Sequence, residues 1–187
     1  MDKDVSAGST TSTLGNLALG LTLLAFGIGG TGVLDGVGAG DAAALATWVG
    51  GVALFMAGLL EFRAGNGGSG TAFAGLGAFW FTWGTSAGTE ASAGATGMFL
   101  LLWALLALTL TAAAKGSGLF GQGVYGLLFV ALLLDGVGSL AENGGLAKAG
   151  GWVAAVAGLA AWYGATAAVA KWPMSLSRAG RGAAATG

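Results

Sequence analysis

The sequence predicts an all-α fold, an integral membrane bundle of six helices with both termini in the cytoplasm. Of its 187 residues, 55% are hydrophobic and only 8% are charged, and the mean hydropathy is +0.80. Soluble domains average roughly 25% charged residues, so this chain could not cover a soluble surface. Six apolar stretches of about the length that crosses a bilayer follow one another. Backbone groups in hydrocarbon must be satisfied within each span, so these stretches are predicted to be helices.

Short breaks that contain Gly, Asp, Asn or Lys separate the six stretches, as expected of turns. The predicted spans are Asn16–Leu34, Asp41–Leu60, Thr71–Ala87, Gly94–Ala114, Leu119–Ala141 and Leu146–Ala170. Residues 1–15 are predicted to be a mobile tail that lacks the features of a cleaved signal peptide, residues 16–170 the membrane domain, and residues 171–187 a cytoplasmic tail. Gly is far above its usual share of about 7%, which indicates close helix packing.

Basic residues predict the orientation of the spans. Lys148 falls on one side of the membrane, and all other basic residues fall on the opposite side: Lys3, Arg63, Lys115, Lys171, Arg178 and Arg181. The positive-inside rule therefore places both termini in the cytoplasm. Between the first two spans, Gly32, Gly36 and Gly40 fit either a small-residue packing strip or a flexible turn.

The composition excludes several chemistries. The chain has no Cys and no His, so thiolate chemistry, the commonest metal ligand and the usual neutral-pH proton carrier are missing. Without a nucleophile–base pair or a cluster of metal ligands, we expect no enzyme, no metal and no cofactor. The net charge of −1 argues against a nucleic-acid partner.

The most distinctive segment joins the second and third predicted spans. It contains Ala57 through Glu61, Gly65-Asn66, Thr71-Ala72-Phe73, Gly77 and Phe79-Trp80, and a weaker match begins at Asn16 and continues with Leu19-Gly20-Leu21. In these positions the sequence resembles the acetate uptake transporter family, also called succinate–acetate permeases. The sequence departs from the family pattern in lacking two N-terminal prolines, in Leu54 where Gln is common, and in Leu76 where Tyr is common.

The resemblance implies a channel or proton-linked permease for acetate and similar short monocarboxylates. It further implies a homo-hexamer of separately conducting protomers in the lipid bilayer, and we expect a multi-pass protein of the cell membrane, the inner membrane of a bacterium. By the same resemblance, bulky apolar side chains of the first, third and fifth spans narrow the pathway, near Leu24 to Phe26, Leu76, and Leu132 or Leu133.

A carboxylic acid with a pKa of roughly 4 to 5 is almost wholly ionised at neutral pH, and a charge in hydrocarbon is costly. No Lys or Arg lies well inside a predicted span, so neutral amides, hydroxyls and helix N-termini are the expected donors. Weak binding of this kind suits conduction, because an ion must also leave. The predicted pathway residues are Asn16, Leu19, Thr22, Phe26, Thr71, Phe73, Leu76, Phe79, Leu132 and Asn143.

Two acidic residues have two interpretations each. Glu61, close to Arg63, is either a gate or proton acceptor, or one half of a solvated ion pair that holds the loop. Asp135 interrupts an apolar run and is a proton carrier if it is buried. If its helix ends at Gly136 or Gly138, Asp135 lies instead at the outer interface.

Two other functions stay open at this point. An aliphatic lining, together with the missing Gln and Tyr, also fits a pore for small neutral solutes such as ammonia, urea or an alcohol. A structural protein whose Gly-rich faces serve only oligomer packing is the third possibility.

Overall fold

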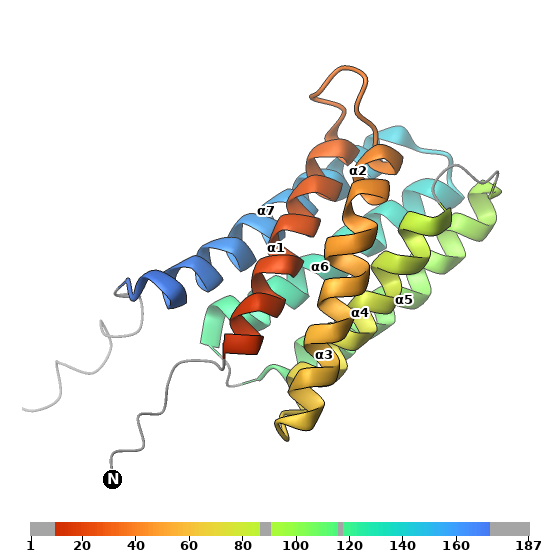
Figure 1. The fold of residues 1–187 in the computed structure, drawn as a ribbon. Coiled ribbons are helices and arrows are strands. Elements are labelled where there is room, and N and C mark those ends of the chain that lie inside the picture. Colours follow the sequence, from red (N-terminus) through yellow and green to blue (C-terminus); the bar gives the residue numbers. More distant parts are fainter. Residues whose placement is uncertain (1–9, 87–90, 116–117, 173–187) are drawn as a thin grey trace, which may run out of the picture.

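A computed structural model of the chain describes residues 10–86, 91–115 and 118–172. All regular structure in these ranges is helical, which confirms the all-α prediction (Figure 1). The elements are α1 (Thr10–Thr31), α2 (Ala39–Ala46), the π-helix η1 (Thr47–Ala53), α3 (Leu54–Arg63), α4 (Gly67–Ser86), α5 (Ala93–Ala113), α6 (Gly118–Leu140) and α7 (Gly144–Ala170). Most of the two predicted tails, with Lys3, Arg178 and Arg181, lies outside the described residues.

Four of these helices are long and apolar enough to cross a membrane, judged by length and composition: α1 from Thr11, α5, α6 from Gly121, and α7. The three elements α2, η1 and α3 follow one another without a break and form a single rod in Figure 1. Each predicted span therefore lies along a continuous helical segment. The largest boundary difference is in α1, which begins at Thr10 and not at Asn16.

The π-helix η1 lies where this rod crosses two neighbours. A Cβ atom on Gly50 would lie 2.5 Å from Cγ2 of Thr22 in α1, and one on Gly51 would lie 3.0 Å from the Cα of Phe81 in α4. Two adjacent glycines thus allow the rod to touch both helices at once. A π-helix is a locally widened turn that is frequent at functional sites.

Helices α1 and α7 pack with their backbones in contact. A Cβ on Gly20 would lie 2.6 Å from the backbone nitrogen of Trp162, and one on Gly158 would lie 2.5 Å from that of Leu24. Small residues permit this close approach in membrane helices, where dispersion forces and backbone contacts replace the hydrophobic effect. This contact is the main backbone connection between the two halves of the bundle.

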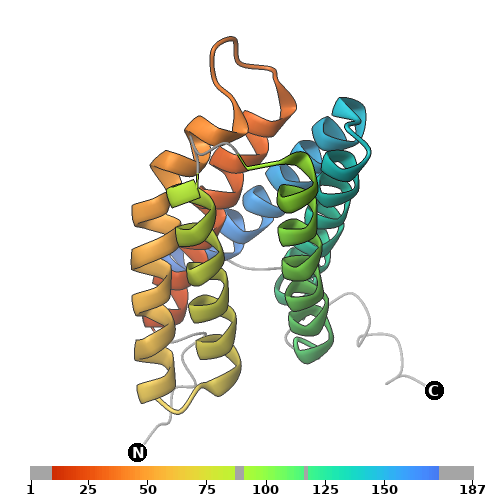
Figure 2. The ribbon, with the colours of Figure 1, turned by 90° about the vertical axis from the view of Figure 1, so that its right-hand side faces the viewer.

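The first half comprises α1 to α4 and the second half α5 to α7. Figure 2 shows α2–α4 and the α5–α6 pair on opposite sides of the molecule. Helices α4 and α5 follow each other in the chain but meet chiefly through side chains: the ring of Phe79 lies 5.7 Å from that of Phe99 and 5.4 Å from that of Trp103. The interior is consequently filled by large side chains rather than by closely packed backbones.

The backbone conformation of the loop between α1 and α2 explains why glycines occur there. Gly32 and Gly36 have φ values of 68° and 76°, which favour glycine. No atom lies within 4 Å of a Cβ built on Gly36 or Gly40. Of the two alternatives, the structure gives the turn for Gly32 and Gly36, while Gly40 lies in the first turn of α2. The three glycines do not share a helix face, because Gly32 and Gly36 follow the end of α1 and Gly40 lies in α2.

Replacing Gly158 by Ala should destabilise the protein, because the new methyl group collides with the backbone of α1 at Leu24. Overpacking of this kind costs about 1 to 3 kcal/mol. Thermal unfolding of the purified protein in detergent, followed by tryptophan fluorescence, measures the change. Gly164→Ala on the same helix is the control, since no atom lies within 4 Å of its Cβ position. Equal melting temperatures for the two variants would contradict the packing argument.

Candidate functional site

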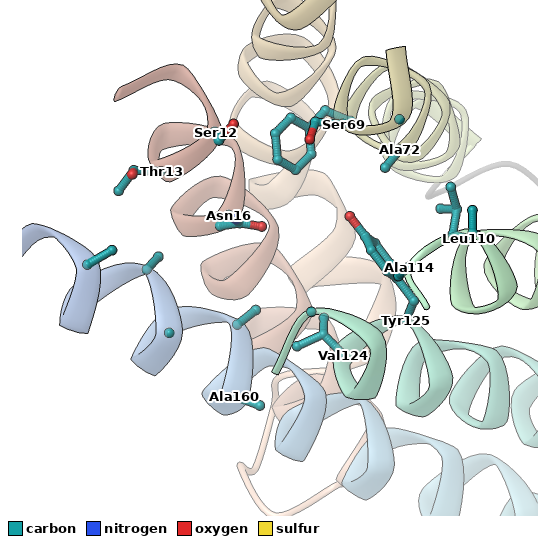
Figure 3. A pocket seen from close by; sticks show the side chains of 18 residues that line it. Ser12, Thr13, Asn16, Ser69, Ala72, Leu110, Ala114, Val124, Tyr125 and Ala160 are labelled. Atoms are coloured by element: carbon teal, nitrogen blue, oxygen red, sulfur yellow. The ribbon is translucent and has the colours of Figure 1, made fainter. Parts of the chain in front are cut away.

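A cavity of about 490 Å³ opens at one end of the bundle. The first turns of α1, α4 and α6 and the last turns of α5 and α7 form its wall, so five helices meet there. Figure 3 shows Asn16 of α1 and Tyr125 of α6 extending into it. Its polar side chains are neutral: Ser12, Thr13, Asn16, Ser69 and Tyr125. The cavity can therefore solvate a small polar solute but offers no fixed charge of its own.

Apolar side chains close the interior beyond this cavity. On α4 the cavity wall ends at Phe73, and the next turn carries Leu76. Besides Leu54 of α3, six described leucines are at most 1% exposed: Leu19 and Leu23 of α1, Leu76 of α4, Leu100 of α5, and Leu128 and Leu132 of α6. We call this set the leucine layer. Because these side chains are buried, solvent does not reach them in the described conformation.

An aromatic cluster fills the bundle near the leucine layer. It consists of Phe26, Phe79, Trp80, Trp83, Phe99 and Trp103. The ring of Phe26 meets those of Trp80 and Trp83 edge-to-face, with centroids 5.2 and 5.8 Å apart. The cluster joins α1, α4 and α5, so it closes the interior across both halves.

Four buried polar atoms have no hydrogen-bond partner within the described part of the chain. They are Oγ1 of Thr22, Nε1 of Trp80, Nε1 of Trp83 and Oδ2 of Asp135. A buried polar group without a partner is costly and calls for an explanation. Three of the four lie on α1 and α4, the helices that also supply Phe26 and Phe79.

Asp135 lies inside α6, which continues to Leu140, so the helix does not end at Gly136 or Gly138. The residue is 8% exposed, and its carboxylate packs against α7 at Gly150, where a Cβ atom would collide with Oδ1. The structure thus gives the buried alternative for this residue. Lys148, two positions earlier on α7, is exposed.

The structure does not show the solvated ion pair of Glu61 and Arg63 that was one of the two interpretations of the sequence. Its side chain is 0% exposed. Ser12 Oγ donates to Glu61 Oε1 at 2.8 Å, and Asn66 Nδ2 donates to Oε2 at 2.8 Å. Arg63 is exposed. Glu61 therefore ties the first turn of α1 to the α3–α4 loop, and Ser12 carries this link into the cavity wall.

The structure brings most of the predicted pathway residues together. Asn16 and Phe73 line the cavity, and the remaining apolar ones, with Thr22, are buried behind it: Leu19, Phe26, Leu76, Phe79 and Leu132. Two residues lie elsewhere. Thr71 is exposed and donates its hydroxyl to the carbonyl of Gly67 at 2.8 Å. Asn143 is exposed and caps the start of α7 by accepting from the Gly145 N–H at 2.9 Å. Since the last turns of α7 line the cavity, Asn143 lies at the opposite end of this helix.

Sequence reasoning missed Ser12, Tyr125 and the two tryptophans of α4. Trp80 is part of the family motif but not of the predicted pathway, yet it is 0% exposed. The spacing of Phe79, Trp80 and Trp83 around one face of a helix is a signal for a buried aromatic contact. Ser12 carried no signal, because its partner Glu61 is far away in the sequence.

These features define a helical membrane protein with a polar mouth and an apolar, closed interior. Residues 5–179 match the GPR1/FUN34/yaaH family model, and the chain belongs to this family, which confirms the resemblance found in the sequence. It is therefore a multi-pass membrane protein.

Three relatives are informative. The chain is 30% identical over 159 residues to the succinate-acetate/proton symporter SatP of Escherichia coli strain K12, covering 80% of this chain and 82% of the relative. It is 29% identical over 137 residues to ammonia transport outward protein 2 of Saccharomyces cerevisiae, covering 67% of this chain and 49% of the relative. The solved structure of the bacterial acetate channel SatP superposes with a TM-score of 0.78 at 27% identity, over 88% of this chain and 93% of that one.

Replacing Ser12 by Ala should destabilise the cavity wall, because the buried Glu61 carboxylate loses a donor. A hydrogen bond to a charged group contributes about 1.5 to 3 kcal/mol. The loss should appear as a lower melting temperature in detergent. Ser86→Ala is the matched control, since that exposed hydroxyl donates within its own helix to the carbonyl of Thr82. A melting temperature for Ser12→Ala as high as that of Ser86→Ala would refute the link.

Proposed function

We propose that the protein is a membrane channel or proton-linked permease for acetate and similar short monocarboxylates. The observation that carries this proposal is the polar but uncharged cavity, which leads to an interior closed by the leucine layer. The relatives named for succinate, acetate and protons support the substrate class. A transporter of this kind needs no catalytic residue, so we propose no enzymatic activity.

The proposed membrane arrangement has six spans: α1, the α2–η1–α3 rod, α4, α5, α6 and α7. The 20 residues of α4 extend about 30 Å at 1.5 Å per residue, which matches the hydrocarbon thickness. This unit begins at Thr10 and ends at Ala170, so the predicted N-terminal tail of residues 1–15 is wrong for residues 10–15, which form the first turns of α1. The support for cytoplasmic termini is the positive-inside rule. Lys115 and Lys171 follow the ends of α5 and α7, which line the cavity, and Arg63 ends α3 just before the start of α4, which also lines it.

The cavity then faces the cytoplasm of a bacterial cell, and its basic surroundings attract carboxylates. Exposed apolar side chains on α3, α5 and α7 suit contact with lipid or with neighbouring protomers. By the family resemblance we propose a homo-hexamer in which each protomer conducts separately.

A carboxylate entering from the cavity would exchange water for the Asn16 amide and the Tyr125 hydroxyl, both in the wall. It would next meet the leucine layer. A constriction of aliphatic side chains resists hydrated ions by dewetting and passes solutes that carry a methyl group more readily. Thr71 and Asn143 lie away from this route in the described conformation. Any contact that they make with the transported solute would therefore occur at another stage of transport.

Asp135 is the proposed proton carrier. It is buried within α6 against α7, and its Oδ2 has no partner within the described residues. An ionisable group inside a membrane span marks a functional site by default. Glu61 is instead proposed to hold the mouth in shape, because both of its carboxylate oxygens accept hydrogen bonds from Ser12 and Asn66.

A pore for ammonia is the second candidate. The leucine layer contains no polar atom in its side chains, and a neutral solute crosses such a layer more easily than an anion does. The yeast relative that is named for ammonia transport supports this second candidate. The same reconstituted protein can test both functions.

The test is uptake of labelled acetate into proteoliposomes, driven either by an inward proton gradient or by voltage alone. Uptake that depends on the proton gradient is expected for a coupled permease, and Asp135→Asn should then abolish proton-driven accumulation while acetate exchange at equilibrium persists. The control is Asp41→Asn, since Asp41 is exposed and its Oδ2 accepts from the Gly38 N–H at the start of α2.

Each outcome decides between the proposals. Voltage-driven uptake that needs no proton gradient makes the protein an anion channel and removes the role of Asp135. Retained proton-driven accumulation in Asp135→Asn also removes that role. Absent acetate uptake with rapid ammonia flux favours the neutral-solute pore.

A further inference from the structure

Two indole N–H groups in the aromatic cluster are donors without acceptors. Trp80 is 0% exposed, and Nε1 of both Trp80 and Trp83 is buried with no hydrogen-bond partner within the described residues. Buried tryptophans usually find a partner for this N–H. Two such donors on one helix, three residues apart, share a face and indicate a common acceptor.

The surroundings of the two indoles limit the kind of acceptor. Both rings contact the same two phenyl rings: Phe79 lies 4.8 Å from Trp80 and 6.3 Å from Trp83 between centroids, and Phe26 lies 5.2 and 5.8 Å away. An acceptor reaching this place must therefore be small and must tolerate apolar contact. The positive edges of aromatic rings also favour negative charge.

We propose that Trp80 and Trp83 form a carboxylate-binding site, in which their N–H groups donate to the carboxylate oxygens while the phenyl rings of Phe26 and Phe79 contact the methyl group. The proposal rests on the function proposed above, since it assigns that substrate a stopping place inside the bundle. The site opens when Phe26, which touches both indoles, moves aside.

The chemistry of this site suits transport. Neutral N–H donors bind an anion less tightly than Lys or Arg would, so the carboxylate can leave again. The site would also replace part of the hydration that the carboxylate loses at the leucine layer. These hydrogen bonds would lower the free energy of the anion in the low-dielectric interior.

The test compares Trp80→Phe and Trp83→Phe with the wild type in labelled acetate flux. Each change keeps an aromatic ring and removes the N–H, so the half-saturating acetate concentration should rise about tenfold or more, as expected for the loss of a hydrogen bond to a charged group. Flux of acetamide, which has nearly the same shape but no charge, should change less than about twofold. Trp103→Phe is the matched control, because it belongs to the same cluster but its N–H is not among the unpartnered buried atoms.

Binding is measured separately by saturation-transfer NMR on the acetate methyl protons with purified protein. If the wild type binds acetate and the two variants lose binding, the site stands, whether or not flux is seen. If the wild type carries no acetate yet binds it at this site, the transport function fails and the site remains. If Trp80→Phe and Trp83→Phe both behave like Trp103→Phe, or if the wild type does not bind acetate, the site is refuted.

A further variant covers the case in which Trp80→Phe does not fold. Incorporation of β-(3-benzothienyl)alanine at position 80 keeps the shape of the indole and replaces its N–H by sulfur. The same rise in half-saturating acetate concentration is expected. Unchanged acetate binding by this isosteric protein would overturn the assignment to the N–H group.

Discussion

The backbone contact between α1 and α7 is the constraint on which the rest of this structure depends. Gly20 and Gly158 allow the two helices to approach until a single added methyl group would collide. Because the two halves of the bundle are joined there, α4 and α5 stay apart, and large side chains fill the space between them. Close packing on one side of the bundle thus creates a side-chain-filled interior on the other.

That interior has an order that fits solute passage. A cavity with neutral donors comes first, followed by the leucine layer and the aromatic cluster with its unpartnered N–H groups. None of the buried side chains in these layers is basic, so selectivity has to come from size, dewetting and weak donors rather than from a fixed cation.

The helices could be predicted from the sequence because the bilayer sets their length and forces backbone hydrogen bonds inward. The buried leucines and phenylalanines of the pathway followed from the family pattern. Tertiary details could not be predicted. Glu61 accepts a hydrogen bond from Ser12, which is remote in sequence, and the burial of Asp135 depends on Gly150 of the next helix. Whether the Trp80 N–H has an acceptor depends on all of the side chains packed around it. Gly32 and Gly36 were ambiguous because spacing alone does not distinguish a helix face from a loop.

The central claim is that the leucine layer is the closed part of a solute pathway and not merely a packed core. The chain has no Cys, so Leu76→Cys introduces a single thiol at the buried layer, and Leu59→Cys places one on the exposed face of α3. Reaction with a small anionic methanethiosulfonate, added to protein in liposomes, is the measurement. We predict that the thiol at position 76 reacts slowly, that acetate protects it, and that the one at position 59 gives no acetate-dependent change. A thiol at position 76 that never reacts, or that acetate does not protect, would contradict the account.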